Sequence, residues 1–269
     1  KVEEYEGVLS KYFNNNNVVT LNSGTAALQL SLRLAGVGHG DEVISTPMTC
    51  TATNMPILAA GAKIVWADID KDTGLICPHS IESKITNKTK AINMVHFGGI
   101  PCDIDSINQI AASYNIKTIE DGAHAFGSEY KGKKIGNHSD FVIFSLQAIK
   151  HITTIDGGLL LCKSDEDAKR AKLLRWYGID RDTPRKDFRC EENIVEYGYK
   201  FHMNDICAVI GIEQMDYVDN LVKRHISNAD FYDKNLNDID KVRLIPRSSE
   251  ALSASWLYTL HVEERDQFM

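Results

Sequence analysis

Residues 140–162 read "DFVIFSLQAIKHITTIDGGLLLC", and this stretch holds the pattern that decides the fold. It opens and closes on continuously apolar runs, which are typical of strands buried on both faces of a parallel sheet. Between the two runs stands Lys150, followed by Thr-Thr, Asp and Gly-Gly. Lysine is normally solvated at the surface. A lysine placed where a buried strand ends therefore needs a chemical reason.

The same pattern recurs along the first 165 residues. Helix-like stretches such as "GTAALQLSLRLAG" (24–36) and "DIDSINQIAASYN" (103–115) separate the short apolar runs. This alternation predicts an α/β fold with three layers, in which a mostly parallel sheet lies between two layers of helices. The expected strands are residues 18–23, 41–46, 63–69, 91–96, 117–122, 140–146 and 157–162.

The pattern changes after the last of these strands. A helix is expected over residues 165–178, and the stretch 183–202 is polar and rich in aromatic residues. A long helical stretch then begins at Asn204 or Asp205, either of which is a good N-cap. The closing "SASWLYTLHV" (253–262) has the character of a strand.

These changes predict two domains. We expect a large domain over residues 1–220 and the start of a smaller C-terminal domain over residues 221–269. The small domain is expected to be truncated, because neither end of the sequence resembles a natural terminus.

The composition excludes several classes of protein. The chain has 30 basic and 37 acidic residues and a net charge of −7, with no basic stripe for nucleic acid. Its six cysteines lack metal-binding spacing and are expected to be free thiols of a cytoplasmic protein. No apolar run approaches the roughly 18 residues of a membrane span, and the N-terminus has no signal-peptide pattern.

The first candidate site is "NSGTAAL" (22–28), which follows a strand. Gly24 allows a ligand to approach the backbone closely, and the helix that begins there offers free N–H groups to an anion. Ser23 and Thr25 add hydroxyl groups. A plain helix cap would use the same residues, so this segment alone leaves both interpretations open.

The second candidate is "IEDGAHAFG" (119–127), in which Asp121 ends a strand. A carboxylate there can cap a helix, or it can hold a protonated ring nitrogen in its cationic form. His124, three residues on, is expected on the same face and can be either structural or functional.

The third candidate is the opening stretch, with Ser145 at the end of a strand and Lys150 five residues later. A desolvated lysine has a lowered pKa and can attack a carbonyl to form a Schiff base. A lysine whose charge reaches solvent, or one that holds a phosphate, is the alternative. Taken together, the three candidates supply the parts that pyridoxal 5′-phosphate (PLP) needs, namely a phosphate cradle, an acid for the ring nitrogen and a lysine for the aldehyde.

The sequence also resembles the DegT/StrS family of sugar-nucleotide aminotransferases, which are PLP-dependent enzymes of fold-type I. The segments that carry this resemblance include "NSGTAAL", "GDEVISTPMTCTATNMPILAAG", "IEDGAHAFGSEYKGKKIG", "FSLQAIKHITTIDGGLL" and "YGYKFHMNDICAVIGIEQM". The resemblance implies that Lys150 links to the cofactor and moves protons, while Asp121 binds the pyridine nitrogen. It further implies that His124 bonds the cofactor and that Gly24 and Thr25, joined by Ser145, bind its phosphate.

Two positions depart from the family pattern. Cys50 stands where the family commonly has an aromatic residue that stacks on the pyridine ring. Lys200 stands where the family has an asparagine that reaches the cofactor phosphate from the partner subunit, and a lysine can serve there as a point charge.

The resemblance implies a homodimer that transfers an amino group, from glutamate, to a nucleotide-linked keto sugar. A sugar dehydratase on the same fold is an alternative, but relatives of that kind replace the lysine with histidine, whereas here His151 only adjoins Lys150. A non-catalytic sensor with this fold is a third possibility. The arginines of "WYGIDRDTPRKDFR" (176–189) either meet a substrate diphosphate or lie in a solvated loop.

Overall fold

The computed structural model describes residues 1–181, 184 and 194–268. In this part of the chain a seven-stranded sheet has the order β1-β9-β8-β5-β4-β2-β3. All neighbours pair in parallel except β9, which is antiparallel to both β1 and β8. All seven expected strands are confirmed, and so is a mostly parallel sheet. The strands are β1 (Val18–Leu21), β2 (Glu42–Ser45), β3 (Lys63–Trp66), β4 (Thr89–Val95), β5 (Lys117–Asp121), β8 (Phe141–Ser145) and β9 (Gly158–Cys162).

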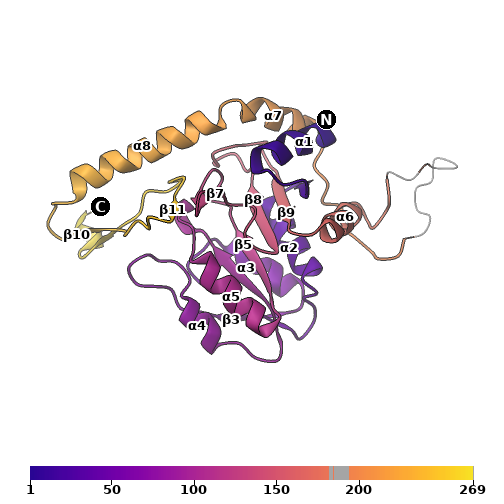
Figure 1. The fold of residues 1–269 in the computed structure, drawn as a ribbon, viewed down its shortest axis with the longest axis horizontal. Helices are drawn as coiled ribbons and strands as arrows, with labels where there is room; N and C mark the ends of the chain where they lie inside the picture. Colours follow the sequence, from indigo (N-terminus) through magenta and orange to yellow (C-terminus); the bar gives the residue numbers. More distant parts are fainter. Residues whose placement is uncertain (182–183, 185–193, 269) are drawn as a thin grey trace.

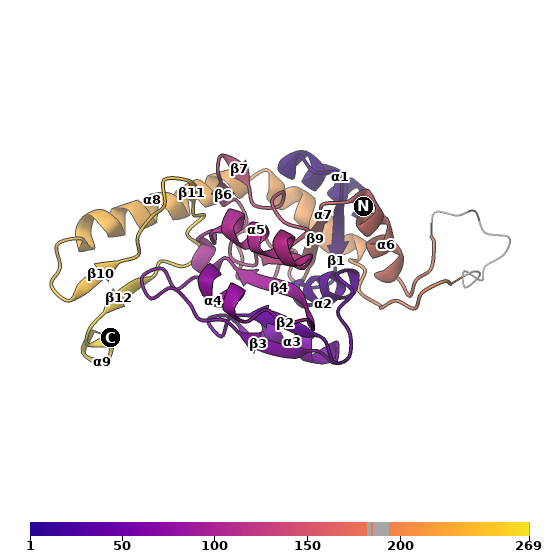
Figure 2. The ribbon, with the colours of Figure 1, turned by 60° about the horizontal axis from the view of Figure 1, so that its bottom comes forward.

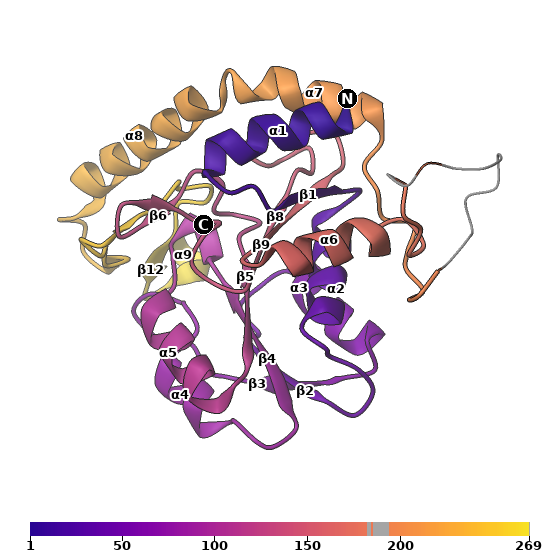
Figure 3. The ribbon, with the colours of Figure 1, turned by 45° about the vertical axis from the view of Figure 1, so that its right-hand side comes forward.

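Helices cover both faces of this sheet, which confirms the three-layer α/β class. Figure 3 shows α4 and α5 on one side of the strands and α2, α3 and α6 on the other. Two separate clusters of buried apolar side chains fill the spaces between the layers. The helices of the large sheet are α1 (Val2–Phe13), α2 (Gly24–Leu34), α3 (Thr51–Ala59), α4 (Pro78–Ser83), α5 (Ile104–Tyr114), α6 (Asp165–Leu174) and α7 (Asp205–Met215).

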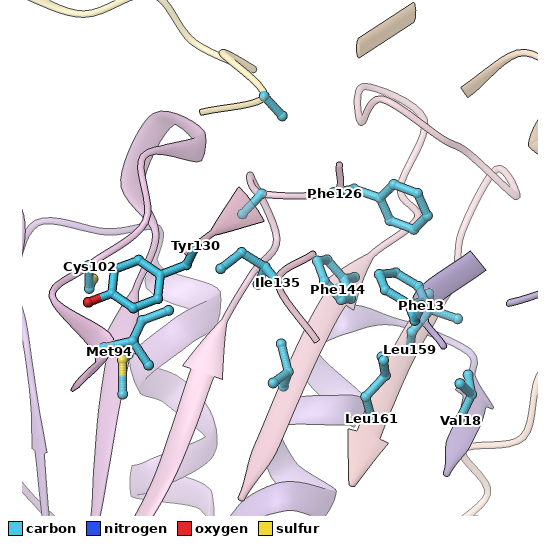
Figure 4. Close-up of a cluster of buried hydrophobic side chains, with 14 of the residues drawn as sticks. Phe13, Val18, Met94, Cys102, Phe126, Tyr130, Ile135, Phe144, Leu159 and Leu161 are labelled. Carbon is cyan, nitrogen blue, oxygen red and sulfur yellow. The ribbon is translucent and has the colours of Figure 1, made fainter. Parts of the chain in front are cut away.

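An aromatic cluster fixes the strand that precedes Lys150 (Figure 4). Phe144 on β8 stacks on Phe13 at the end of α1, with ring centroids 5.1 Å apart. Phe126 meets Phe13 edge-on at 5.3 Å. Buried aromatic pairs of this kind add roughly 0.5–1.5 kcal/mol beyond the area that they bury. They hold the end of β8, and so Ser145, in place.

The expected long helix after Asn204 is two helices, α7 and α8 (Val218–Leu236), which follow one another along the molecule (Figures 1 and 2). Asn204 is the N-cap, since its side chain accepts the N–H of Cys207 at 3.0 Å. Val222 of α8 packs in the same apolar cluster as α1 and β8. The predicted boundary between residues 220 and 221 falls within α8, and the division into two domains stays a prediction.

The prediction of a strand over residues 253–262 is wrong for most of its length. Strand β12 covers only Leu260–Val262 and pairs with β10 (Val242–Leu244), while β11 (Ala251–Leu252) ends before the segment. Between them Ser255 has a positive φ of 52°. The Ser253 hydroxyl accepts the N–H of Ser255 at 3.0 Å. Serine side chains that bond their own backbone in this way compete with strand pairing.

The smaller elements attach this C-terminal part to the rest. Strand β11 pairs with β6 (Glu129–Tyr130), which forms a hairpin with β7 (Lys133–Lys134). Lys131 and Gly132 form the turn between these two short strands. A short helix α9 (Arg265–Phe268) follows β12. Among the helices of the described residues, none is long and apolar enough to cross a membrane.

Candidate active site

The carboxyl ends of five strands meet at one edge of the sheet. Strands β1, β2, β4, β5 and β8 all run in the same direction, because β9 is antiparallel to both β1 and β8. A cavity of about 400 Å³ lies at this edge. It is lined by eight of the nine residues that the sequence singled out: Ser23, Gly24, Thr25, Cys50, Asp121, His124, Ser145 and Lys150.

The N-terminus of α2 forms one end of the cavity. Ser23 caps the helix, with its Oγ accepting the N–H of Ala26 at 3.0 Å and its carbonyl accepting that of Ala27 at 3.1 Å. These bonds leave the first N–H groups, those of Gly24 and Thr25, at the cavity. Ser23 is thus a helix cap, which was one of the two interpretations of this segment. The helix end still offers N–H groups to an anion.

Gly24 is required by the close approach of α2 to β8. A Cβ atom at Gly24 would lie 3.0 Å from Cβ and 3.4 Å from Oγ of Ser145. This contact places the Ser145 hydroxyl beside the start of the helix. Gly24 and Ser145 were predicted to bind a phosphate together. They are adjacent in the structure, although they are 121 positions apart in the chain.

Asp121 lies at the floor of the cavity and is only 3% exposed. Burial raises the pKa of its carboxyl group above the ordinary value. A hydrogen bond of 2.7 Å from Thr53 Oγ1 and one of 3.1 Å from the N–H of Ala123 act in the opposite direction. A buried carboxylate of this kind gains most from a cationic partner in the cavity, and a protonated ring nitrogen supplies one.

His124 presents a neutral imidazole to the cavity. Burial lowers its pKa to about 4, with the charges of Lys150 and His151 acting in the same direction. Its Nδ1 accepts the N–H of Gly98 at 3.3 Å. The proton of the neutral ring must then be on Nε2. His124 can therefore donate a hydrogen bond from Nε2, and its bond to a cofactor stays a prediction.

Lys150 is half-buried, and burial lowers the pKa of its amine. The electrostatic interaction of Lys150 with Asp121 acts against this shift of its pKa. Its Nζ lies 3.7 Å from the ring centroid of Trp256. A lowered pKa increases the share of free amine at neutral pH, which is the form that attacks a carbonyl.

The two unusual positions differ in their placement. Cys50 is exposed, lines the cavity and precedes α3. Lys200 does not line this cavity; it pairs with Trp176 in an isolated bridge, and its Nζ lies 3.5 Å from that ring. The prediction that Lys200 serves the cavity of a partner subunit stays a prediction.

Two residues of the site were missed by sequence reasoning. Thr53 lies in the first turn of α3, within the "TPMTCTAT" segment that was considered only for Cys50. Its position just after a strand end was a usable signal. Trp256 lies in the segment that was taken for a strand, and no local pattern marked it.

Comparison with known proteins identifies the chain. The sequence profile described as the DegT/DnrJ/EryC1/StrS aminotransferase family matches residues 1–269. The chain belongs to this family. It is therefore an aminotransferase, and the resemblance found in the sequence is confirmed.

Individual relatives agree with this membership. The chain is 40% identical to the uncharacterized protein MJ1066 of Methanocaldococcus jannaschii, over 97% of this chain and 68% of that protein. It is similar to the crystal structure of the sugar aminotransferase CalS13 from Micromonospora echinospora, with a TM-score of 0.94 and 38% identity, over 100% of this chain and 74% of that one.

A third similar structure is that of Spr1654 from Streptococcus pneumoniae, in its PLP form. The TM-score is 0.88 and the identity 34%, over 97% of this chain and 70% of that one. The sequence predicted a fold-type I architecture. The similar solved sugar aminotransferases agree with this prediction.

The residues at the cavity of this aminotransferase fit PLP. A helix N-terminus and Ser145 suit its phosphate, buried Asp121 suits its ring nitrogen, and Lys150 suits its aldehyde. No group of three or more histidine, cysteine or acidic side chains is placed to hold a metal ion within residues 1–181, 184 and 194–268.

Proposed function

We propose that this family member uses PLP to transfer an amino group, from glutamate, to the keto carbon of a nucleotide-linked sugar. The observation that carries this proposal is the shared cavity of Lys150 and Asp121. One is an amine whose pKa is lowered by burial, and the other is a carboxylate buried to 3% exposure. Bound PLP would supply an aldehyde for amines and an electron-withdrawing ring.

The protein residues have distinct tasks in this scheme. The N–H groups at the start of α2 and the hydroxyl of Ser145 hold the phosphate at one end of the cavity. Asp121 keeps the ring nitrogen cationic, and Thr53 and the N–H of Ala123 orient the carboxylate. His124 donates a hydrogen bond from Nε2 to an oxygen on the ring. Cys50 lies at the mouth, where it covers part of the ring face.

Lys150 both holds the aldehyde and moves the proton of the reacting carbon. As a free amine it takes a proton from the amino donor, and as an ammonium it returns one during transfer to the sugar. The donor leaves as a keto acid, and the sugar ketone becomes an amine. Because the pKa of Lys150 is lowered, the free amine makes up a larger share of the side chain at neutral pH, beside the ammonium.

The structure favours transfer over dehydration. A dehydratase of this family would use a histidine in place of the lysine, and His151 is the adjacent candidate. His151 is only 6% exposed, and the described lining of the cavity contains Lys150 but not His151. These observations support Lys150, rather than His151, as the reactive residue.

The sugar substrate is supported by the neighbours, since CalS13 is named a sugar aminotransferase. The nucleotide, the glutamate donor and a homodimer in the cytoplasm are proposed from the family resemblance. Arg185 and Arg189, considered for a substrate diphosphate, lie outside the described residues, whereas Arg181 packs over the Trp176 ring at 4.7 Å.

The test is an absorption spectrum of the protein with PLP, before and after borohydride. We expect a lysine-linked band that borohydride fixes to Lys150 and that Lys150→Ala abolishes. Lys163→Ala, which removes an exposed lysine, is the matched control and should retain the band. A band that survives in Lys150→Ala would refute the assignment. Adding glutamate and then candidate keto-sugar nucleotides to the loaded parent identifies the donor and the acceptor.

A further inference from the structure

Trp256 contacts two of the functional side chains at once. Its ring stacks on that of His124, with centroids 4.1 Å apart and planes inclined by 23°. On the same indole lies the ammonium of Lys150, with Nζ 3.7 Å from the centroid. Among the described residues beyond 250, none lines the cavity itself, and Trp256 is the one with a ring contact to Lys150.

Hydrogen bonds attach the segment Ser253–Leu257, which carries Trp256, to the rest of the chain. They come from the indole and from backbone N–H groups before and after Trp256. The indole Nε1–H donates to the carbonyl of Ile149 at 2.9 Å. The N–H of Leu257 donates to the carbonyl of Gly98 at 3.2 Å, and the N–H of Ala254 donates to Ser128 Oγ at 2.9 Å. Trp256 is thus tied to the residue next to Lys150 and to the turn that bonds His124.

The turn at Gly99 packs closely against the backbone of the Ser253–Leu257 segment. Gly99 has a positive φ of 99°, and a Cβ atom there would lie 3.2 Å from the N of Ser255 and 3.3 Å from that of Trp256. A side chain at Gly99 would push the segment away. The approach of Trp256 to the cavity is therefore built into the backbone.

The contact has a direct electrostatic meaning. The face of an indole ring attracts a cation, and the attraction grows when the cation is partly desolvated, as Lys150 is. We propose that Trp256 is a positioning residue for Lys150: the face of its indole ring holds the ε-ammonium when that nitrogen is protonated and not bonded to the cofactor. This role rests on the proposed function, in which Lys150 must repeatedly leave and rejoin the aldehyde.

A second pair in the same chain provides a matched control. The Nζ of Lys200 lies 3.5 Å from the ring of Trp176, outside the cavity. Replacing Trp176 removes an equivalent contact without touching the one at Lys150.

The test uses the cofactor-free protein and compares Trp256→Phe with Trp256→Leu. Both changes remove the indole N–H and leave apolar side chains of similar bulk, but only phenylalanine keeps a ring face. The measurement is the pH midpoint for acylation of Lys150 by trace acetic anhydride, followed by peptide mass spectrometry. The ring stabilises the ammonium, so we expect the midpoint to be higher in the Phe variant by about half a unit to one unit.

A second readout follows the attachment of PLP. The rate at which borohydride-fixed PLP appears on Lys150, divided by its free-amine fraction, should fall by about threefold or more in Trp256→Leu and recover in Trp256→Phe. Trp176→Leu should match the parent in the acylation midpoint of Lys150, which is measured without the cofactor.

Equal acylation midpoints in the Phe and Leu variants would overturn the proposal, and so would an equal shift in Trp176→Leu. If the parent itself attaches no PLP to Lys150, the proposed function fails, while the midpoints still test the contact between ring and ammonium.

Discussion

The hydroxyl of Thr53 donates a 2.7 Å hydrogen bond to Oδ2 of Asp121, and the two residues are 68 positions apart in the chain. Thr53 lies in the first turn of α3, the helix that follows β2, and Asp121 ends β5, so the bond joins this helix to the end of a strand. It also orients the carboxylate, because the other oxygen accepts the N–H of Ala123. The reactive geometry of Asp121 therefore depends on α3 as well as on its own strand.

Asp121→Asn removes the charge that would hold the ring nitrogen cationic. We expect PLP still to attach to Lys150, while the rate of the half-reaction with glutamate falls by about 10²–10⁴-fold. Thr53→Val removes only one hydrogen bond and raises the pKa of Asp121 further, and a loss of about tenfold is expected. Stopped-flow absorbance of the loaded protein measures both rates. A rate in Asp121→Asn equal to that of the parent would show that Asp121 has only a structural task.

Gly24→Ala tests the phosphate end of the cavity. The added Cβ would lie 3.0 Å from Cβ of Ser145 and must push the start of α2 away from β8. We expect the affinity for PLP to fall towards that for pyridoxal, which lacks the phosphate. Titration of each ligand by absorbance gives the ratio of the two affinities.

The matched control for that variant is Gly7→Ala on α1, where no atom lies within 4 Å of an added Cβ. Alanine in a helix interior is more favourable than glycine by roughly 0.5–1 kcal/mol. The control should keep the parent's preference for PLP. If Gly24→Ala also keeps the parent's ratio of affinities for PLP and pyridoxal, the start of α2 does not bind the phosphate.

Much of this site could be predicted from the sequence, because strand ends in a parallel sheet gather at one edge. Gly24 and Lys150 each come shortly after an apolar strand and Asp121 ends a strand, and all three line the same cavity. The direction of β9 could not be predicted, since an apolar run carries no sign of strand polarity. Trp256 was not identified from the sequence for a different reason. Its contact with Lys150 depends on the path of a segment more than 100 residues away, which local pattern does not encode.

Two histidines near the site predict an acid-sensitive fold. Burial lowers the pKa of both His124 and His151 to about 4, and for His151 the charge of His225 adds to this effect. An unfolded chain takes up these protons near pH 6.5, whereas the folded chain does so only near pH 4. Stability is therefore complete above pH 6.5 and is lost as the pH falls towards 4, by at most about 1.4 kcal/mol per pH unit for each histidine.

Urea unfolding at pH 7, 6 and 5 measures this loss. His151→Gln removes one of the two groups and should flatten the decline. His79→Gln changes an exposed histidine on α4 and should leave the decline as in the parent. An equal slope in His151→Gln and the parent would contradict the assignment.

The last prediction concerns Lys200, which lies outside the cavity of its own chain and is proposed to reach that of a partner. Lys200→Ala alone should weaken PLP binding at Lys150. In an equal mixture with Lys150→Ala, each mixed dimer would contain one site with both lysines intact, the site of the Lys200→Ala chain. With random pairing, about half of the chains that still have Lys150 should regain the parent's affinity. Borohydride fixation at limiting PLP, followed by mass spectrometry, counts those chains. No recovery in the mixture would place the action of Lys200 within its own chain, since a residue that serves its own site cannot be replaced by a partner's.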